Sequence, residues 1–115
     1  MASTSTKVSN IFDQLPQSAL SGELFETILE GKHCRLERIV STGQTTPDGE
    51  WYDQEQDEWV IVLQGTAKLV FEPDHVIELQ AGDYINIPAH QRHRVSWTDP
   101  NQVTVWLALH VMPDQ

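Results

Sequence analysis

The chain has 115 residues, of which 39% are hydrophobic and 21% charged, and its formal net charge at pH 7 is −10. This length allows one domain with a single modest core, and the composition is that of a folded chain rather than a disordered one. With seven Lys and Arg residues and no apolar run near the roughly 18 residues of a membrane span, the chain is expected to bind neither nucleic acid nor a membrane.

The first 22 residues are expected to form a flexible arm in front of a folded domain at residues 23–112. The opening segment MASTSTKVSN is small and polar, and it lacks the apolar core of a secretory signal. In the following segment, NIFDQLP, Asn10 can cap a helix and Pro16 can end one, so we expect a short helical turn there. The single cysteine, Cys34, cannot form an internal disulfide, which indicates a reducing cytoplasm.

From Leu24 onward, short runs rich in Val, Ile, Leu and Trp alternate with turn signals, which predicts an all-β domain. About eight short strands without a long helix are typical of a sandwich or a small barrel. The expected strands are Leu24–Glu30, Cys34–Ser41, Glu58–Gln64, Thr66–Phe71, His75–Leu79, Tyr84–Ile87, His93–Trp97 and Val103–His110.

In two of these strands, the alternation of apolar and polar side chains also indicates what covers each face. Both faces of Glu58–Gln64 are apolar, so we expect the barrel interior to cover one face and a second sheet, the arm or a partner subunit to cover the other. This pattern predicts a homodimer. In the last strand, Trp106 and His110 share one face. A Trp and a His there indicate a pocket lining, although a hydrogen-bonded core histidine gives the same pattern.

Two segments carry polar residues that could bind a metal or transfer protons. The first runs from Tyr52 through Gln54 to Glu58, and the second is the stretch GDYINIPAHQRHRVSW, which contains His93. Residues two apart on a strand point to one face, so Tyr52, Gln54 and Glu58 are expected to project together. If the strand of His93 faces that of Glu58 across a small barrel, an acid and an imidazole meet in an apolar interior. An ionised glutamate there needs a charged partner, hydrogen bonds or a metal.

Together the two segments resemble the two motifs of the cupin family, over the chain from about Leu24 to Val111. In the first motif, two histidines one residue apart precede a glutamate and a glycine. Glu58 and Gly65 match that part of the motif, and Tyr52 and Gln54 stand where it has the histidines. The second motif is matched at Gly82, Pro88 and His93 and altered at His90 and Trp97.

The resemblance implies a single-domain double-stranded β-helix, or jelly-roll, barrel. It also implies a divalent metal such as Mn, Fe, Ni or Zn, for which the available ligands here are Gln54, Glu58 and His93, with His90 and His110 as candidate substitutes. The alternative is a metal-free polar cluster of Glu58 and His93.

For function, the resemblance implies a small oxygenated substrate, such as a sugar, sugar acid or keto acid, and isomerase or lyase chemistry. A dioxygenase is less favoured, because a site poor in imidazole holds iron weakly. Tyr52, Glu58 and His93 are the candidate catalytic residues, with Tyr52 as a general acid. The alternative is a module that binds or senses a small ligand without turnover. The candidate pocket residues are Trp51, His90, Trp97, Trp106 and His110.

Overall fold

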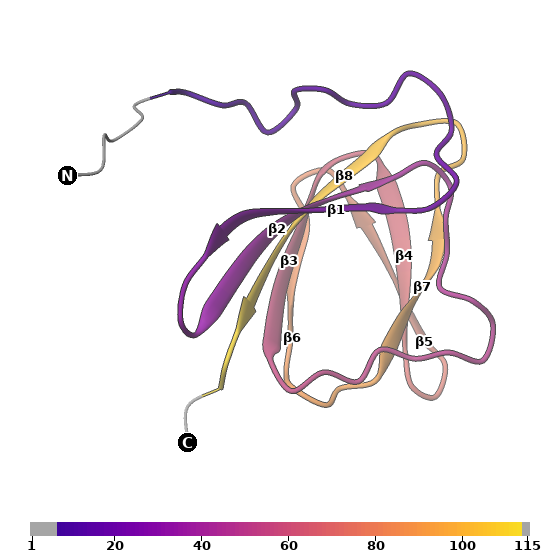
Figure 1. Ribbon diagram of the computed structural model, residues 1–115. Coiled ribbons are helices and arrows are strands. Elements are labelled where there is room, and N and C mark those ends of the chain that lie inside the picture. The colour runs from indigo at the N-terminus through magenta and orange to yellow at the C-terminus, as the bar shows by residue number, and fades with distance from the viewer. Residues whose placement is uncertain (1–6, 114–115) are drawn as a thin grey trace.

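The computed structural model describes residues 7–113, and within that range the protein is an all-β domain of eight strands (Figure 1). A five-stranded sheet has the order β1-β2-β8-β3-β6, and a three-stranded sheet has the order β5-β4-β7. All strand pairs are antiparallel. The strands are β1 (Leu24–Glu30), β2 (Cys34–Ser41), β3 (Asp57–Gln64), β4 (Thr66–Phe71), β5 (His75–Gln80), β6 (Tyr84–Ile87), β7 (His93–Thr98) and β8 (Thr104–Val111). The prediction of an all-β barrel-like domain is confirmed, and each strand ends within about one residue of its expected position.

The prediction of a helical turn near the N-terminus is wrong. The backbone N–H groups of Phe12 and Asp13 donate to the side chain and the carbonyl of Asn10, at 2.8 and 3.0 Å, and form a single turn. Gln14 then has a φ of 57°, a left-handed conformation that a helix cannot continue through. One turn before Pro16 is too short to repay helix nucleation. The first six residues of the expected flexible arm lie outside the described residues, and no described helix is long and apolar enough to cross a membrane.

The hydrophobic core lies between the two sheets and receives side chains from both. Side chains alternate between the two faces of β3, and this determines which of them join the core. Val60 and Val62 are almost fully buried between the sheets. Trp59 and Ile61, on the opposite face, are half-buried. The core residues are Ile39, Val60, Val62, Ala67, Leu69, Leu79, Ile87, Trp106 and Ala108. Burial of one face of each strand is what closes the two sheets over a common interior.

Gly65 connects β3 of one sheet to β4 of the other, and the geometry there requires glycine. Its φ is 91°, and a Cβ atom at this position would lie 2.7 Å from the Cα atom of Thr104 on β8. Both the backbone conformation and the contact therefore exclude a side chain. This close approach lets the chain pass from one sheet to the other in a single residue.

Candidate functional site

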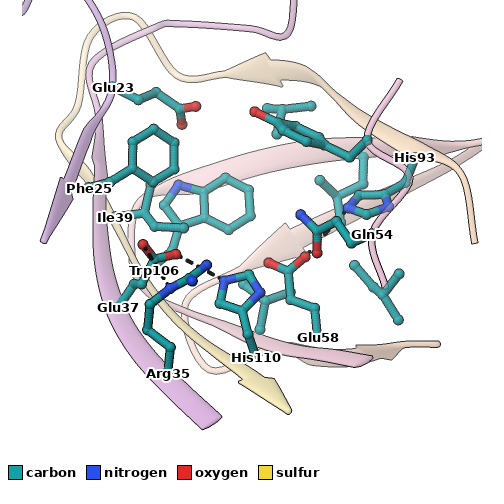
Figure 2. Close-up of a pocket in the computed structure, with 15 residues that line it drawn as sticks. Glu23, Phe25, Arg35, Glu37, Ile39, Gln54, Glu58, His93, Trp106 and His110 are labelled. Atoms are coloured by element: carbon teal, nitrogen blue, oxygen red, sulfur yellow. Dashed lines mark hydrogen bonds and ion pairs between the residues drawn. The ribbon is translucent and has the colours of Figure 1, made fainter. Parts of the chain in front are cut away.

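A cavity of about 260 Å³ lies in the interior, with walls from both sheets (Figure 2). Its apolar walls include Val60 and Ile87 from the five-stranded sheet and Leu69 and Val95 from the three-stranded sheet. Its titratable and amide side chains are Glu23, Arg35, Glu37, Tyr52, Gln54, Glu58, His93 and His110. Such a polar group inside an apolar shell is typical of a small-molecule site.

Strand β8 brings two polar strands together around His110. It pairs with β2 on one side, where His110 lies opposite Arg35, and with β3 on the other side, where His110 lies opposite Glu58. Glu37 follows Arg35 by two residues on β2, so both side chains reach the same cavity. The pairing register therefore gathers these charged groups from three neighbouring strands.

Glu58 and His93 form the first carboxylate–imidazole pair, across the cavity from one sheet to the other. The Nε2 atom of His93 lies 3.5 Å from Oε1 of Glu58, and the two residues are 5% and 8% exposed. The other ring nitrogen, Nδ1, lies 2.9 Å from the carbonyl of Gln91. Burial lowers the pKa of His93, but the hydrogen-bond and charge interactions with Glu58 and Gln91 outweigh burial, so the net pKa is raised. The pair therefore favours an imidazolium beside a carboxylate.

Glu37 and His110 form the second pair, within the five-stranded sheet. The Nε2 atom of His110 lies 2.9 Å from Oε1 of Glu37, while Nε of Arg35 lies 3.5 Å from the other oxygen of Glu37. An ionised carboxylate only accepts hydrogen bonds, so Nε2 of His110 donates. In the neutral ring, Nδ1 of His110 then carries the lone pair. Glu37 thus orients an imidazole whose second nitrogen is free to accept a proton.

Tyr52 lies next to His93 through an isolated β-bridge. Its backbone N–H donates to the carbonyl of His93 at 2.7 Å, and the two rings are 5.6 Å apart between centroids. Burial raises the pKa of the Tyr52 phenol, and the negative charges of Glu23 and Glu58 raise it further against a hydrogen bond with Thr46. The phenol is therefore a neutral hydrogen-bond donor rather than an anionic metal ligand.

Glu23, immediately before β1, contributes a third carboxylate that sequence reasoning missed. It accepts a hydrogen bond from the hydroxyl of Ser41, whose oxygen in turn accepts one from Nε1 of Trp106 at 3.0 Å. Burial raises the pKa of Glu23, and the Ser41 hydrogen bond offsets only part of that effect. No strand pattern marks Glu23. Arg35 and Glu37, also missed, had a signal, because they alternate with Ile39 on one face of a predicted strand.

Among the candidate pocket residues, Trp106 and His110 belong to the cavity lining, whereas Trp51, His90 and Trp97 do not. His90 lies on a loop and its ring contacts the exposed carboxylate of Asp53 at 2.8 Å. Trp97 packs instead beneath the ammonium of Lys68, 5.5 Å from the ring centroid. A β-bulge in the β4–β7 pairing shifts the register before Trp97, so strand parity counted from His93 no longer holds there.

Three polar atoms in the cavity lining are buried and lack a hydrogen-bond partner within residues 7–113. They are Nε of Arg35, Oε1 of Gln54 and Nδ1 of His110. Buried polar atoms in folded proteins nearly always have partners, because an unpaired one loses its hydration without compensation. Three of them in one cavity are therefore placed to receive the groups of a ligand.

The expected metal ligands include only two side chains of the His, Cys, Asp and Glu types. Gln54, Glu58 and His93 all line the cavity, but across residues 7–113 no group of three or more His, Cys, Asp or Glu side chains could hold a metal ion. The substitutes add little, because His90 is outside the lining and His110 already bonds to Glu37. One imidazole, one carboxylate and one neutral amide are a weak donor set for the expected transition metals.

Comparison with known proteins identifies related chains. The Cupin domain family model matches residues 37–111. A crystal structure of a "putative mannose-6-phosphate isomerase" from Ralstonia eutropha JMP134 is 44% identical, covering 93% of this chain and 99% of that chain with a TM-score of 0.88. A search of curated proteins finds no match.

Two more distant structures share the fold alone. A cupin superfamily protein from Desulfitobacterium hafniense DCB-2 is 17% identical, with a TM-score of 0.70 and coverage of 85% of this chain and 84% of that chain. An RmlC-like cupin family protein from Methanocaldococcus jannaschii, with a double-stranded β-helix fold, is 14% identical, with a TM-score of 0.66 and coverage of 86% and 87%. The same arrangement of strands is thus found at very low sequence identity.

Proposed function

Since this chain belongs to the cupin family, we propose that its cavity binds a small oxygenated compound, of the sugar or hydroxy-carbonyl type, and catalyses an isomerase-like proton transfer on it. The observation that supports this most is the presence of two carboxylate–imidazole pairs on one small cavity, Glu58–His93 and Glu37–His110. Two such pairs with different environments supply an acid and a base to the same substrate.

In this proposal one pair acts as the base and the other as the acid. His110, held through Nε2 by Glu37, would accept the proton from a carbon next to a carbonyl group at its Nδ1 atom. His93, whose raised pKa favours the imidazolium form, would donate to the carbonyl oxygen as negative charge develops there. Return of the proton from His110 to the former carbonyl carbon, with loss of the proton of the neighbouring hydroxyl group to His93, forms the new carbonyl group, restores both imidazoles and leaves no net change in protons. Tyr52 is a second donor beside His93.

The name of the Ralstonia eutropha protein supports isomerase chemistry at the level of reaction class. At 44% identity over nearly the whole of both chains, the two proteins are close enough for a shared reaction type to be a reasonable hypothesis. The substrate does not follow from the name, because a few side chains in the cavity decide it.

Deuterium incorporation in D₂O tests the proposed chemistry even while the product is unidentified. The protein is incubated with a panel of aldoses, ketoses, sugar acids and small hydroxy-carbonyl compounds, and exchange at the carbon next to the carbonyl is followed by NMR. We expect exchange with at least one compound, and a loss of about 100-fold or more in His110→Asn or His93→Asn. The matched control, His75→Asn, changes an exposed histidine on β5 and is expected to retain full exchange.

The proposal fails if no compound exchanges above the rate without protein, or if the folded His110 and His93 variants exchange as fast as wild type. Circular dichroism of each variant separates a chemical effect from unfolding. If His93→Asn unfolds, the His110 variant alone carries the test.

The second candidate is a module that binds its ligand without turnover. The three unpartnered cavity atoms favour it, since they require only that a ligand supplies hydrogen bonds. Such a module would show a ligand-dependent increase in melting temperature with no deuterium exchange and no product. The same compound panel therefore distinguishes the two candidates.

A divalent metal held by Gln54, Glu58 and His93 remains a prediction from the family resemblance. Its support is that Oε1 of Gln54 is unpartnered and lies in the same cavity as the acid and the imidazole. Elemental analysis of protein purified without nickel resin or chelator decides it. Stoichiometric metal would support the prediction; its absence, with no stabilisation on adding Mn²⁺, Fe²⁺, Ni²⁺ or Zn²⁺, would refute it.

The homodimer also remains a prediction. Strand β1 is at the edge of the five-stranded sheet, and its Phe25, Ile28 and Leu29 side chains are 52%, 49% and 61% exposed. An edge strand with exposed apolar side chains is suited to association with a second copy. Light scattering at micromolar concentration tests this, with the mass of two chains expected and the mass of one chain as the contrary result.

A further inference from the structure

We infer that the cavity selects an uncharged ligand rich in hydroxyl groups and discriminates against the phosphorylated form of the same compound. The inference rests on the proposed function, because it names the substrate class of that same cavity. At about 260 Å³, the cavity is at the lower end of ligand-pocket sizes, so its ligand is as small as a single sugar ring.

The described part of the cavity lining holds three carboxylates, those of Glu23, Glu37 and Glu58, against one guanidinium and two imidazoles. Figure 2 shows Glu23 on one side of the cavity and Glu58 and His110 on the other, with Glu37 and Arg35 beside His110. Arg35, the one Lys or Arg among these lining residues, forms an ion pair with Glu37, with Nε 3.5 Å from the carboxylate. Glu58 lies 3.5 Å from His93, so Glu23 is the carboxylate of the described lining that an entering anion meets without a cationic side chain paired to it.

Two of the three unpartnered atoms in the described cavity lining can accept hydrogen bonds. Oε1 of Gln54 can only accept, and Nδ1 of His110 accepts when Nε2 donates to Glu37. The carboxylates of Glu23 and Glu58 have further accepting capacity. Hydroxyl groups can donate to all of these atoms. A phosphate group, with acceptor oxygens and a charge of about −1.5 to −2 at neutral pH, cannot satisfy them.

The donors in the cavity do not reverse this preference. Nε of Arg35 is unpartnered and could bind a phosphate oxygen, but turning the guanidinium to a phosphate would remove its contact with Glu37, the residue that orients His110. His93 already lies against Glu58, and the phenol of Tyr52 is a neutral donor that brings no positive charge to a phosphate. These donors instead suit the carbonyl or ring oxygen of an uncharged ligand. Burial, which raises the pKa of Glu23, opposes the charge of a buried phosphate even more strongly.

The preference differs from what the Ralstonia eutropha protein's name would predict, since that name contains a sugar phosphate. Under the inference, this chain acts on the unphosphorylated compound. A reaction that supplies its substrate would release a free sugar rather than transfer a phosphoryl group to one.

Calorimetric titration with matched pairs tests the inference. The probes are glucose, mannose and galactose, each compared with its 6-phosphate at the same ionic strength. We expect at least one uncharged sugar to bind and its 6-phosphate to bind at least tenfold more weakly. Glu23→Gln, which removes one carboxylate with little change in shape, is expected to reduce that ratio at least threefold. The control, Glu78→Gln, removes the same charge from an exposed site on β5 and is expected to leave the ratio unchanged.

The outcomes are distinguishable. If a 6-phosphate binds as tightly as its parent sugar or more tightly, the inference is wrong while the proposed sugar-binding cavity stands. If the ratio is the same in wild type and Glu23→Gln, the electrostatic explanation is overturned. If no member of any pair binds, sugar binding itself is overturned, and the inference falls with it.

Discussion

The two faces of strand β2 each carry a buried arginine nitrogen, but only the arginine on the outer face has its hydrogen bonds satisfied within the described part of the protein. On the outer face, Arg38 is 7% exposed; its Nε atom donates to Glu26 at 2.7 Å, and its Nη1 atom donates to the carbonyls of Ile11 and Asp13 at 2.9 and 2.7 Å. On the inner face, three residues earlier, Arg35 has a buried Nε atom without a hydrogen-bond partner among the described residues.

The difference separates polar groups that hold the fold together from polar groups available to a ligand. Arg38 joins the segment before β1 to the sheet, and its donors are used within the protein. Around the cavity, Arg35 and His110 are oriented by Glu37 but each keeps an unpartnered atom. Incomplete pairing of well-oriented buried groups is what makes this cavity a candidate binding site, more than charge or burial alone.

The largest expected effect is on stability, from Arg38→Met. Loss of the guanidinium leaves two backbone carbonyls and Glu26 without their hydrogen-bond donor. We therefore expect a decrease of about 2–3 kcal/mol in the free energy of unfolding. Arg35→Met removes a donor without a hydrogen bond and a partly exposed ion pair with Glu37, and is expected to cost less than about 1 kcal/mol. Urea unfolding of both variants measures the difference. Equal costs would remove the distinction between the two faces.

The next effect is on the pH dependence of stability, through His93. Its folded-state pKa is raised above the unfolded value of 6.5, so its stabilising contribution is complete below pH 6.5 and is lost as pH rises through the folded pKa. The free energy of unfolding is thus expected to decline above pH 6.5, and His93→Gln is expected to remove this part of the decline. Urea unfolding from pH 5.5 to 9 measures it; an identical pH profile in the variant would contradict the raised pKa.

A smaller effect, of opposite sign, is expected for Glu23→Gln. The folded-state pKa of Glu23 is raised, so its stabilising contribution is complete below pH 4.5 and is lost as pH rises through the folded pKa, after which the buried charge opposes folding. The neutral amide removes that charge, and we expect a gain of less than about 1 kcal/mol at pH 7 that disappears near pH 4. Thermal melting at both pH values tests it, and destabilisation at pH 7 would assign Glu23 to the fold rather than to the site.

The smallest expected effect on stability is that of Gln54→Leu. The amide oxygen of Gln54 has no described partner, and the backbone contact from its carbonyl to the N–H of His90, at 2.8 Å, is retained in the variant. We expect a change within about 0.5 kcal/mol in unfolding and a clear loss of sugar binding. Substantial unfolding would show that Gln54 serves the fold instead.

The sequence predicted the fold well because the fold depends on local alternation and turn chemistry. The strand at Glu58–Gln64 and the turn at Gly65 are both confirmed. The face of Val60 and Val62 is buried, whereas the opposite face, with Trp59 and Ile61, is only half-buried, so the expected cover of that second face stays a prediction. The site was harder to predict. Charged residues such as Arg35 and Glu37 on a strand normally indicate a solvent-exposed face, and only the pairing of β2 with β8 brings them to the interior.

The candidate pocket residues show the same limit. Trp106 lines the cavity because β8 is regular where it pairs with β2, whereas the bulge in β7 moves Trp97 away from the position that simple parity predicts. A bulge of one residue reverses the face on which all later side chains lie. Glu23 precedes the first strand, so no periodic pattern could place it. The residues that could not be predicted from the sequence are thus those whose position depends on the pairing register of distant strands rather than on local sequence.

The most direct measurement is a crystal structure of the protein with the uncharged sugar that binds most tightly in the matched titrations. The expected result is a sugar in the cavity with hydroxyl groups within hydrogen-bond distance of Oε1 of Gln54 and Nδ1 of His110, and an oxygen within hydrogen-bond distance of Nε of Arg35. The contrary result is a sugar bound outside the cavity while those three atoms contact only water or a metal ion.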